Sequence, residues 1–253
     1  MKLFFDHLYR VLNTHTFDSL KKIHSDIPGA SYAKKDTNNG SWEGIYIRLK
    51  DGTYLEFLKE DEEYKSNYIS LCLSQFGNEN KLHQKLIDHY PDHHFKFYDT
   101  KTPEGEPWMH GSMFESPVEN VFLFALDYQG KKAKERKSYG KEETVFFHTV
   151  DQIDFKLNKD QFDHFEQICE WFSEKTIKTK NSIEVRIPQI EHGFLSFVGH
   201  FKQNEADSSY FKIKGKCNSY GLANSTINQI NDIKDIEFEI NQNTYKITYS
   251  KSE

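Results

Sequence analysis

The chain of 253 residues contains little cysteine and no long apolar run. Its three cysteines, Cys72, Cys169 and Cys217, lie far apart and form no CxxC pair. An odd count without metal-ligand spacing favours reduced, buried thiols over a disulfide framework. We therefore expect a cytoplasmic location. No stretch is apolar for long enough to predict a membrane span.

Motifs for nucleotide binding and for common hydrolytic chemistry are also missing. The patterns GxGxxG, GxxxxGK[ST], GxSxG and HExxH do not occur, which argues against a nucleotide cofactor, a serine hydrolase and a zinc peptidase. The net charge of −6 lacks the Lys/Arg excess that nucleic-acid binding uses. The basic run at 130–141 is interpreted as a solvated linker. We predict no nucleic-acid partner and no membrane partner.

Aromatic residues and an internal repeat are what the chain does have. Its 21 Phe and 14 Tyr supply enough apolar area for a sizeable core. The phrase LNTHTFDSL at 12–20 returns as LNKDQFDHF at 157–165, with a constant offset. Asn13 and Asn158 suit a turn or a helix cap, because an Asn side chain can satisfy free backbone N–H groups. The repeat indicates a duplicated fold.

The order of the expected elements supports the duplication. Segment 3–12 alternates like a strand, and a helical stripe follows it up to Pro28-Gly29. Three further strands are then separated by the hairpin signals Asn39-Gly40 and Asp51-Gly52. This β-α-β-β-β order recurs from 67 to 128 and, in degenerate form with additional strands, after residue 142. We predict an α+β fold with one domain at 1–135, made of units 1–66 and 67–128, and a second domain at 136–253.

The first quarter of the chain carries a family resemblance. The residues FFDHLYRVL at 4–12, SWEGIYI at 41–47 and TYLEFL at 53–58 resemble the glyoxalase, or vicinal-oxygen-chelate, superfamily. More narrowly, they resemble an uncharacterised bacterial family of glyoxalase-like proteins. The resemblance implies that two β-α-β-β-β units pair into an eight-stranded, cup-shaped sheet, and that a divalent metal ion sits in the cup.

His7 and Glu56 are the metal ligands that the resemblance implies, one from the first strand and one from the last strand of the unit. An imidazole and a carboxylate suit Mn, Fe, Ni, Co or Zn. Strand alternation predicts that His7 shares a face with Phe5 and Tyr9, opposite Asp6. The alternative is a hydrogen-bonded His–Glu pair without a metal.

The other units do not repeat these ligands. Ser70 and Phe124 take their places in the second unit, and Gln152 and Ser196 in the third. A third ligand must then come from elsewhere. His110, in PWMHGSMFE, is the first candidate and would complete a set of two histidines and one carboxylate; its alternative is a histidine bonded to backbone. His148, His192 and His200 are weaker candidates, and His89, His93 and His94 fall in an expected solvated loop.

Aromatic residues of the expected strands predict a pocket for an organic molecule, since small-molecule sites combine apolar walls with a few polar groups. A plain packed core is the alternative interpretation. Arg48 could bind a carboxylate or phosphate, or be an exposed strand end. Asp127 and Tyr128 are candidates for the pocket rim. The predicted ligand-contacting residues are Tyr9, Trp42, Tyr46, Arg48, Tyr54 and Trp108.

Two functions from different classes follow. The first is a metal-dependent lyase, isomerase or dioxygenase acting on a small molecule. The second is a non-catalytic, metal-free protein that binds a small molecule in the same cup. A third possibility is that the fold serves only to form a homodimer through its exposed strands. A side chain that reaches the space between His7 and Glu56 would favour the enzyme, and an apolar wall there would favour the binding protein.

Overall fold

The computed structural model describes most of the chain and places its strands in two sheets. The described residues are 3–62, 65–66, 68–74, 84, 88, 95–114, 121–130, 145–159, 162–163, 165–166, 169, 176–189, 193–201, 210–218 and 221–250. The first sheet and its helices comprise β1 (Phe4–Leu12), α1 (Thr14–Ile23), the 3₁₀ turn His24–Asp26, β2 (Ala30–Thr37), β3 (Gly40–Arg48), β4 (Tyr54–Lys59), β5 (Ile69–Ser74), β6 (Phe95–Lys101), β7 (Pro107–Phe114) and β8 (Val121–Tyr128). The second comprises β9 (Gln152–Leu157), β10 (Thr176–Lys178), β11 (Ser182–Pro188), β12 (Phe194–Phe201), β13 (Tyr210–Lys216), α5 (Asn224–Asn231), β14 (Ile236–Asn241) and β15 (Thr244–Ser250).

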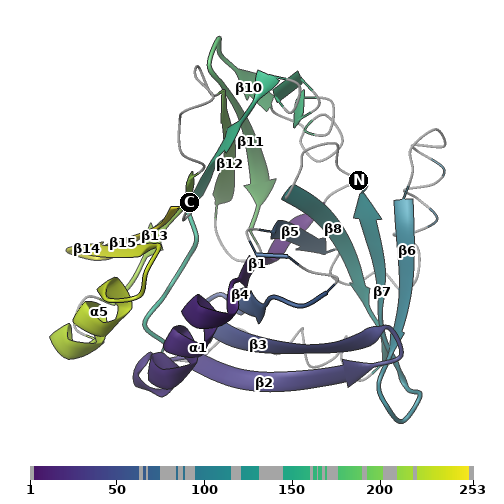
Figure 1. Cartoon of the computed structure of the whole chain (residues 1–253). Helices are drawn as coiled ribbons and strands as arrows, with labels where there is room; N and C mark the ends of the chain where they lie inside the picture. The colour runs from purple at the N-terminus through teal and green to yellow at the C-terminus, as the bar shows by residue number, and fades with distance from the viewer. Residues whose placement is uncertain are drawn as a thin grey trace.

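The first sheet has eight strands in the order β2-β3-β4-β1-β5-β8-β7-β6. Each half repeats one pattern, because the first strand of each unit pairs in parallel with the last strand, β1 with β4 and β5 with β8. The two halves join through antiparallel pairing of β1 with β5. Figure 1 shows that the sheet curls into a half-barrel, with β2 and β3 facing β6, β7 and β8. The predicted α+β fold with two paired units and a cup-shaped sheet is confirmed.

The second sheet contains the third unit and the additional strands. Its order is β10-β11-β12-β9-β13-β15-β14, and β12 pairs in parallel with β9 as β4 does with β1. A shorter β-α-β-β group, β13-α5-β14-β15, completes the sheet. β15 pairs antiparallel with β13, because this group has one strand fewer than the others. The domain boundary predicted at 135–136 lies outside the described residues and stays a prediction.

The repeated phrase forms the same strand-to-helix corner twice. The Phe17 N–H donates to the Asn13 carbonyl at 2.9 Å, and the Phe162 N–H donates to the Asn158 carbonyl at 2.9 Å. Asn13 also caps α1, because its side-chain oxygen accepts from the Thr16 N–H at 2.8 Å. The predicted cap and buried helix stripe of α1 are confirmed, and the corner explains why the phrase recurs.

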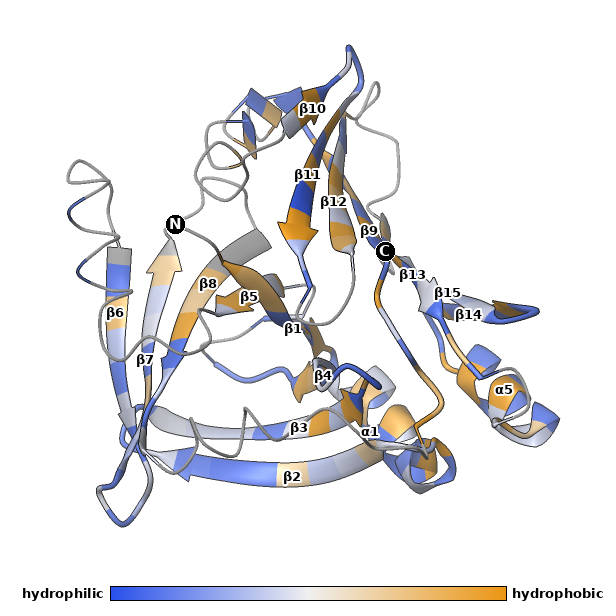
Figure 2. Cartoon of the chain, turned by 180° about the vertical axis from the view of Figure 1, so that it is seen from behind, coloured by the Kyte–Doolittle hydropathy of each residue, from blue (hydrophilic) through white to orange (hydrophobic). Residues whose placement is uncertain are grey.

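The core lies between the two sheets and under α1. One continuous cluster of buried residues includes Leu8 and Leu55 of the first sheet and Phe197 of the second. Arg10 is buried at this junction, and its guanidinium carbon is 4.5 Å from the centre of the Tyr249 ring. In Figure 2 hydrophobic colour gathers on central strand β5, whereas edge strand β2 is mostly hydrophilic. None of the helices in the described part of the chain is long and apolar enough to cross a membrane.

Candidate ligand-binding site

The concave face of the first sheet encloses a cavity of about 340 Å³. Small-molecule sites are typically about 300–1,000 Å³ and mostly apolar. His7 and Glu56 both line the cavity. The predicted ligand-contacting residues also line it, and they are Tyr9, Trp42, Tyr46, Arg48, Tyr54 and Trp108. That these side chains contact a ligand stays a prediction.

A β-bulge in β1 changes which residues face the cup. Phe5 pairs with Leu73 and His7 with Cys72, so Asp6 is an extra residue without an opposite partner on β5. A bulge of this kind re-aims side chains and is common beside functional sites. Phe5 turns into the hydrophobic core and is fully buried. The predicted sharing of a face by Phe5 and His7, with Asp6 opposite, is therefore wrong.

Asp6 instead forms the hydrogen-bonded support of His7. Its Oδ1 is 2.6 Å from His7 Nδ1 and accepts from the Tyr128 hydroxyl at 3.1 Å. Its Oδ2 accepts from the Ser74 hydroxyl at 3.1 Å. Asp6 has no solvent exposure, so these contacts hold it firmly. Strand alternation did not predict this role of Asp6. A signal was present in the sequence, because an Asp next to a His within an aromatic strand needs a hydrogen-bond partner when it is buried.

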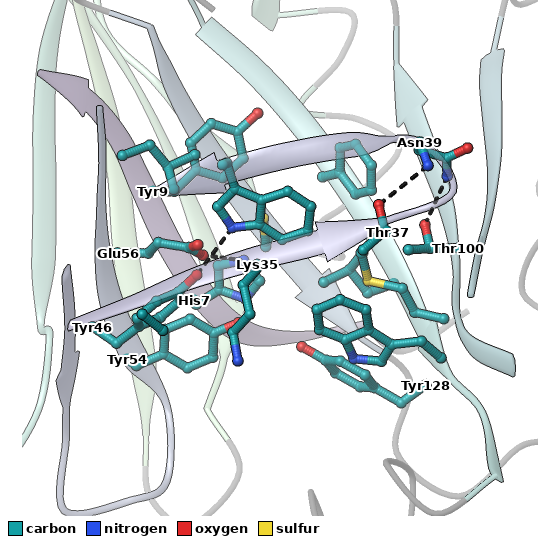
Figure 3. Close-up of a pocket in the computed structure, with 18 of the residues that line it drawn as sticks. His7, Tyr9, Lys35, Thr37, Asn39, Tyr46, Tyr54, Glu56, Thr100 and Tyr128 are labelled. Carbon is teal, nitrogen blue, oxygen red and sulfur yellow. Dashed lines mark hydrogen bonds and ion pairs between the residues drawn. The ribbon is translucent and has the colours of Figure 1, made fainter. Parts of the chain in front are cut away.

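His7 and Glu56 meet at the floor of the cup (Figure 3). His7 Nε2 is 3.7 Å from Glu56 Oε2, and both residues are buried. The Tyr54 ring stacks on the His7 ring, with centroids 4.3 Å apart and planes 11° apart. Burial raises the pKa of Glu56 above its ordinary value, although His7 and a hydrogen bond from Tyr46 act in the opposite direction.

Aromatic side chains from both units form the walls. Trp42 on β3 and Trp108 on β7 stack with ring centroids 6.0 Å apart. The Trp42 indole N–H donates to the Tyr46 hydroxyl at 3.0 Å. The Trp108 Nε1 is buried and has no hydrogen-bond partner within the described part of the chain. The cavity is therefore mainly apolar, with a polar floor.

His110 lies away from this floor. Its Nδ1 is 3.3 Å from Asp99 Oδ1 on the neighbouring strand, and it is not among the residues that line the cavity. The reason is a second bulge, because Trp108 is an extra residue between two paired positions of β7. The bulge breaks the alternation that predicted a common face for Trp108 and His110. The structure thus does not bring His110 to His7 and Glu56.

The other candidate histidines also lie elsewhere. His148 is half-buried beyond the cavity lining, where burial lowers its pKa and the charge of Lys50 adds to the effect. His200 is on the second sheet, with Nε2 3.0 Å from Asp154 Oδ1. Asp127 is buried but does not line the cavity, whereas Tyr128 does. The remaining candidates, His89, His93, His94 and His192, lie outside the described residues.

The strand pairings also define the equivalent positions in the other units. Phe124 lies two positions beyond Phe122, the partner of Ser70, as Glu56 lies two positions beyond Tyr54, the partner of His7, so the two predicted equivalences agree with each other. That Ser70 takes the place of His7 stays a prediction. In the third unit, Asp154 pairs with Val198 in the way that Tyr9 pairs with Glu56.

Val198 therefore occupies the position equivalent to Glu56 in the third unit. The prediction that Ser196 takes that place was shifted by two residues and is wrong.

A divalent metal can be tested against the donors of the cup. Two ligands that each bind one ion at about 2.0–2.2 Å can be separated by 3.7 Å, as His7 Nε2 and Glu56 Oε2 are. Catalytic metal sites usually have three protein ligands. Within the described residues, no group of three or more His, Cys, Asp or Glu side chains is arranged to hold an ion. The donors described do not fit a resident catalytic metal.

Comparisons with known proteins concern the fold. No protein-family model matches the chain, and no curated protein sequence matches it. Among solved structures, BphC, a halotolerant catechol dioxygenase, matches with a TM-score of 0.52 and 13% sequence identity, over 92% of this chain and 76% of that chain. A hypothetical protein from Staphylococcus aureus matches with a TM-score of 0.47 and 12% identity, over 80% of this chain and 87% of that chain.

The dioxygenase match and the strand order define the class of fold. Two paired four-stranded units in a half-barrel sheet, with a second sheet built on the same plan, form a fold of the vicinal-oxygen-chelate type. An identity of 13% supports the fold alone. What the cup does must be argued from its own residues.

Proposed function

We propose that this protein binds a small organic molecule in the cup of its first sheet and does so without a metal ion. The observation that carries the proposal is the cavity of about 340 Å³ with aromatic walls and one buried polar floor. Large rigid aromatic side chains bury ligand area at low entropic cost. His7, which Asp6 holds in place, and Glu56 then supply the polar groups that orient the ligand.

Tryptophan fluorescence provides the test, because two of the three tryptophans line the cup. We expect planar aromatic fragments to quench or shift the emission with saturable titration curves. Ala33→Phe places a ring inside the cavity that Ala33 lines and is expected to abolish the saturable signal. Phe194→Ala is the matched control, because Phe194 is 59% exposed on the second sheet and does not line the cavity. Saturable binding that survives Ala33→Phe would place the ligand elsewhere.

The second candidate is a divalent-metal-dependent lyase, isomerase or dioxygenase. One observation favours it. Asp6 holds Nδ1 of His7 and leaves Nε2 toward Glu56, and metal-bound histidines typically have such a carboxylate partner. Elemental analysis and calorimetry on protein purified without a His tag separate the two candidates. Stoichiometric metal that both His7→Ala and Glu56→Ala abolish would support the enzyme, and no metal after loading with Mn, Fe, Ni or Zn would eliminate it.

A further inference from the structure

The hydrogen bonds of Asp6 fix the tautomer of His7. Asp6 accepts from the hydroxyls of Ser74 and Tyr128, so its carboxylate acts as an acceptor. The close contact of 2.6 Å with His7 Nδ1 then requires the proton on Nδ1. In the neutral imidazole, Nε2 then carries the lone pair and presents it to the cup. In this form the floor offers a hydrogen-bond acceptor at Nε2.

The Glu56 carboxyl group faces the first acceptor and is a second acceptor in its ionised form. Glu56 Oε2 is 3.7 Å from His7 Nε2, which is beyond the usual hydrogen-bond distance of about 2.7–3.2 Å. Two acceptors at this separation are best joined by one atom that donates two hydrogens. A nitrogen at about 2.9 Å from each can do so, and an ammonium group has three N–H donors. A hydroxyl group has one, and a carboxylate has none.

The surroundings of the floor also suit a cation. Asp6 and Glu56 place two carboxyl groups in a buried site. Aromatic rings surround it, and ring faces attract ammonium groups. The protein uses this attraction itself, because Lys35 Nζ is 5.9 Å from the centre of the Tyr46 ring. Lys35 and Arg48 line the same cavity, so they disfavour a second positive charge on the ligand.

We propose that the ligand of this cup is a small aromatic primary amine with a single positive charge, whose ammonium group bridges His7 Nε2 and Glu56 Oε2. The aromatic body lies against Trp42 and Trp108, which form the stacked pair of the wall. This inference rests on the proposed function, since it names the ligand class of the same cavity.

Calorimetry with a matched ligand series tests the inference, in low salt and with a chelator present. The probes are phenethylamine, 2-phenylethanol, 3-phenylpropionate and the N,N,N-trimethyl derivative of phenethylamine. We expect phenethylamine to bind about tenfold or more tighter than 2-phenylethanol, because charged hydrogen bonds exceed neutral ones. The trimethyl derivative keeps the charge but has no N–H, so it is expected to lose that advantage.

Two substitutions localise the effect. Glu56→Gln keeps the shape of the side chain but replaces an acceptor oxygen by a donor, so the preference for phenethylamine over 2-phenylethanol is expected to disappear. Glu184→Gln, on the second sheet, is the control and is expected to leave the preference unchanged. Thermal unfolding of each variant checks that the fold is intact.

The outcomes separate this inference from the proposed function. If the alcohol or the acid binds at least as tightly as the amine, the cup binds ligands but the amine is wrong. If none of the probes and no aromatic fragment binds, both proposals fail. If, in a separate titration without the chelator, Zn²⁺ or Mn²⁺ binds stoichiometrically and displaces phenethylamine, the two acceptors form a metal site and the amine is again wrong.

Discussion

A pair of asparagines at the tip of the β2–β3 hairpin closes one end of the cup. Asn38 Nδ2 donates to the Asp99 carbonyl at 2.9 Å, and Asn38 Oδ1 accepts from the Lys101 N–H at 2.8 Å. Asn39 Nδ2 donates to the same carbonyl at 3.3 Å and to Thr100 Oγ1 at 3.1 Å. These bonds connect the edge hairpin of the first unit to edge strand β6 of the second unit, and Figure 3 shows the one between Asn39 and Thr100. We call this contact the asparagine clasp.

Removing the clasp is expected to loosen the cup with little effect on the rest of the fold. Exposed hydrogen bonds contribute near the lower end of the usual range, about 0.5 kcal/mol each. The four bonds then correspond to about 2 kcal/mol of unfolding free energy in the double variant Asn38→Ala, Asn39→Ala. Because the clasp joins two sheet edges, most of this loss is expected as local opening.

Hydrogen exchange at the Lys101 amide measures the opening directly. That amide donates to Asn38 Oδ1, so its protection is expected to fall by about fivefold in Asn38→Ala, which loses two bonds. Asn181→Ala is the control, because Asn181 lies in another exposed turn and its side chain has no hydrogen bond to a described residue. Unchanged protection of the Lys101 amide in the double variant would refute the reasoning. Dissociation of any cup ligand is expected to become faster in parallel.

Three other substitutions test the fold and its electrostatics. Arg10→Ala removes a guanidinium that packs on the Tyr249 ring, and the burial of this guanidinium lowers the Arg10 pKa to about 10. We expect the unfolding free energy, measured in urea, to fall by about 2–4 kcal/mol. A fall below about 0.5 kcal/mol would count against this packing. Gly111→Ala places a Cβ 2.4 Å from Phe124 Cε1, so we expect a destabilised protein with weaker ligand binding, measured by thermal unfolding and fluorescence titration. Burial raises the pKa of Asp154, but its hydrogen bonds outweigh burial and lower it. This carboxylate therefore stabilises the fold above its unfolded pKa of about 3.9, and the contribution is lost as pH falls through the lower folded pKa. Asp154→Asn is thus expected to lower the unfolding free energy at pH 7, and the difference between the variant and the parent protein is expected to be smaller at pH 3. An equal difference at the two pH values would contradict the assignment.

The general fold could be predicted because its signals are local. The turn signals Asn39-Gly40 and Asp51-Gly52 separate three strands as expected. The alternation of β4 is regular, because Leu55 and Phe57 pack in the core on the side opposite Glu56. These features depend only on residue spacing and on turn chemistry. The sequence is therefore sufficient for the order of the elements in the units that the structure describes.

The site was less predictable because two bulges determine it. A bulge adds one residue and reverses the face of every residue beyond it, and no residue type marks its position. In β1 it brings Asp6 beside His7. In β7 it separates Trp108 from His110. An expectation based on strict alternation therefore placed His110 in the cup as a metal ligand and missed Asp6, the carboxylate that holds His7.

The face of the second sheet that corresponds to the cup has diverged from it in sequence. At the positions of Tyr9 and Glu56 it has Asp154 and Val198. Asp154 is bound there by His200 and Lys214, so its charge is already neutralised within the protein. In the first sheet, by contrast, Asp6 is fully bonded and positions His7, while His7 Nε2 and Glu56 Oε2 stay too far apart to bond to each other. A ligand that donates hydrogen bonds can satisfy both acceptors, which is why we assign binding to the first sheet.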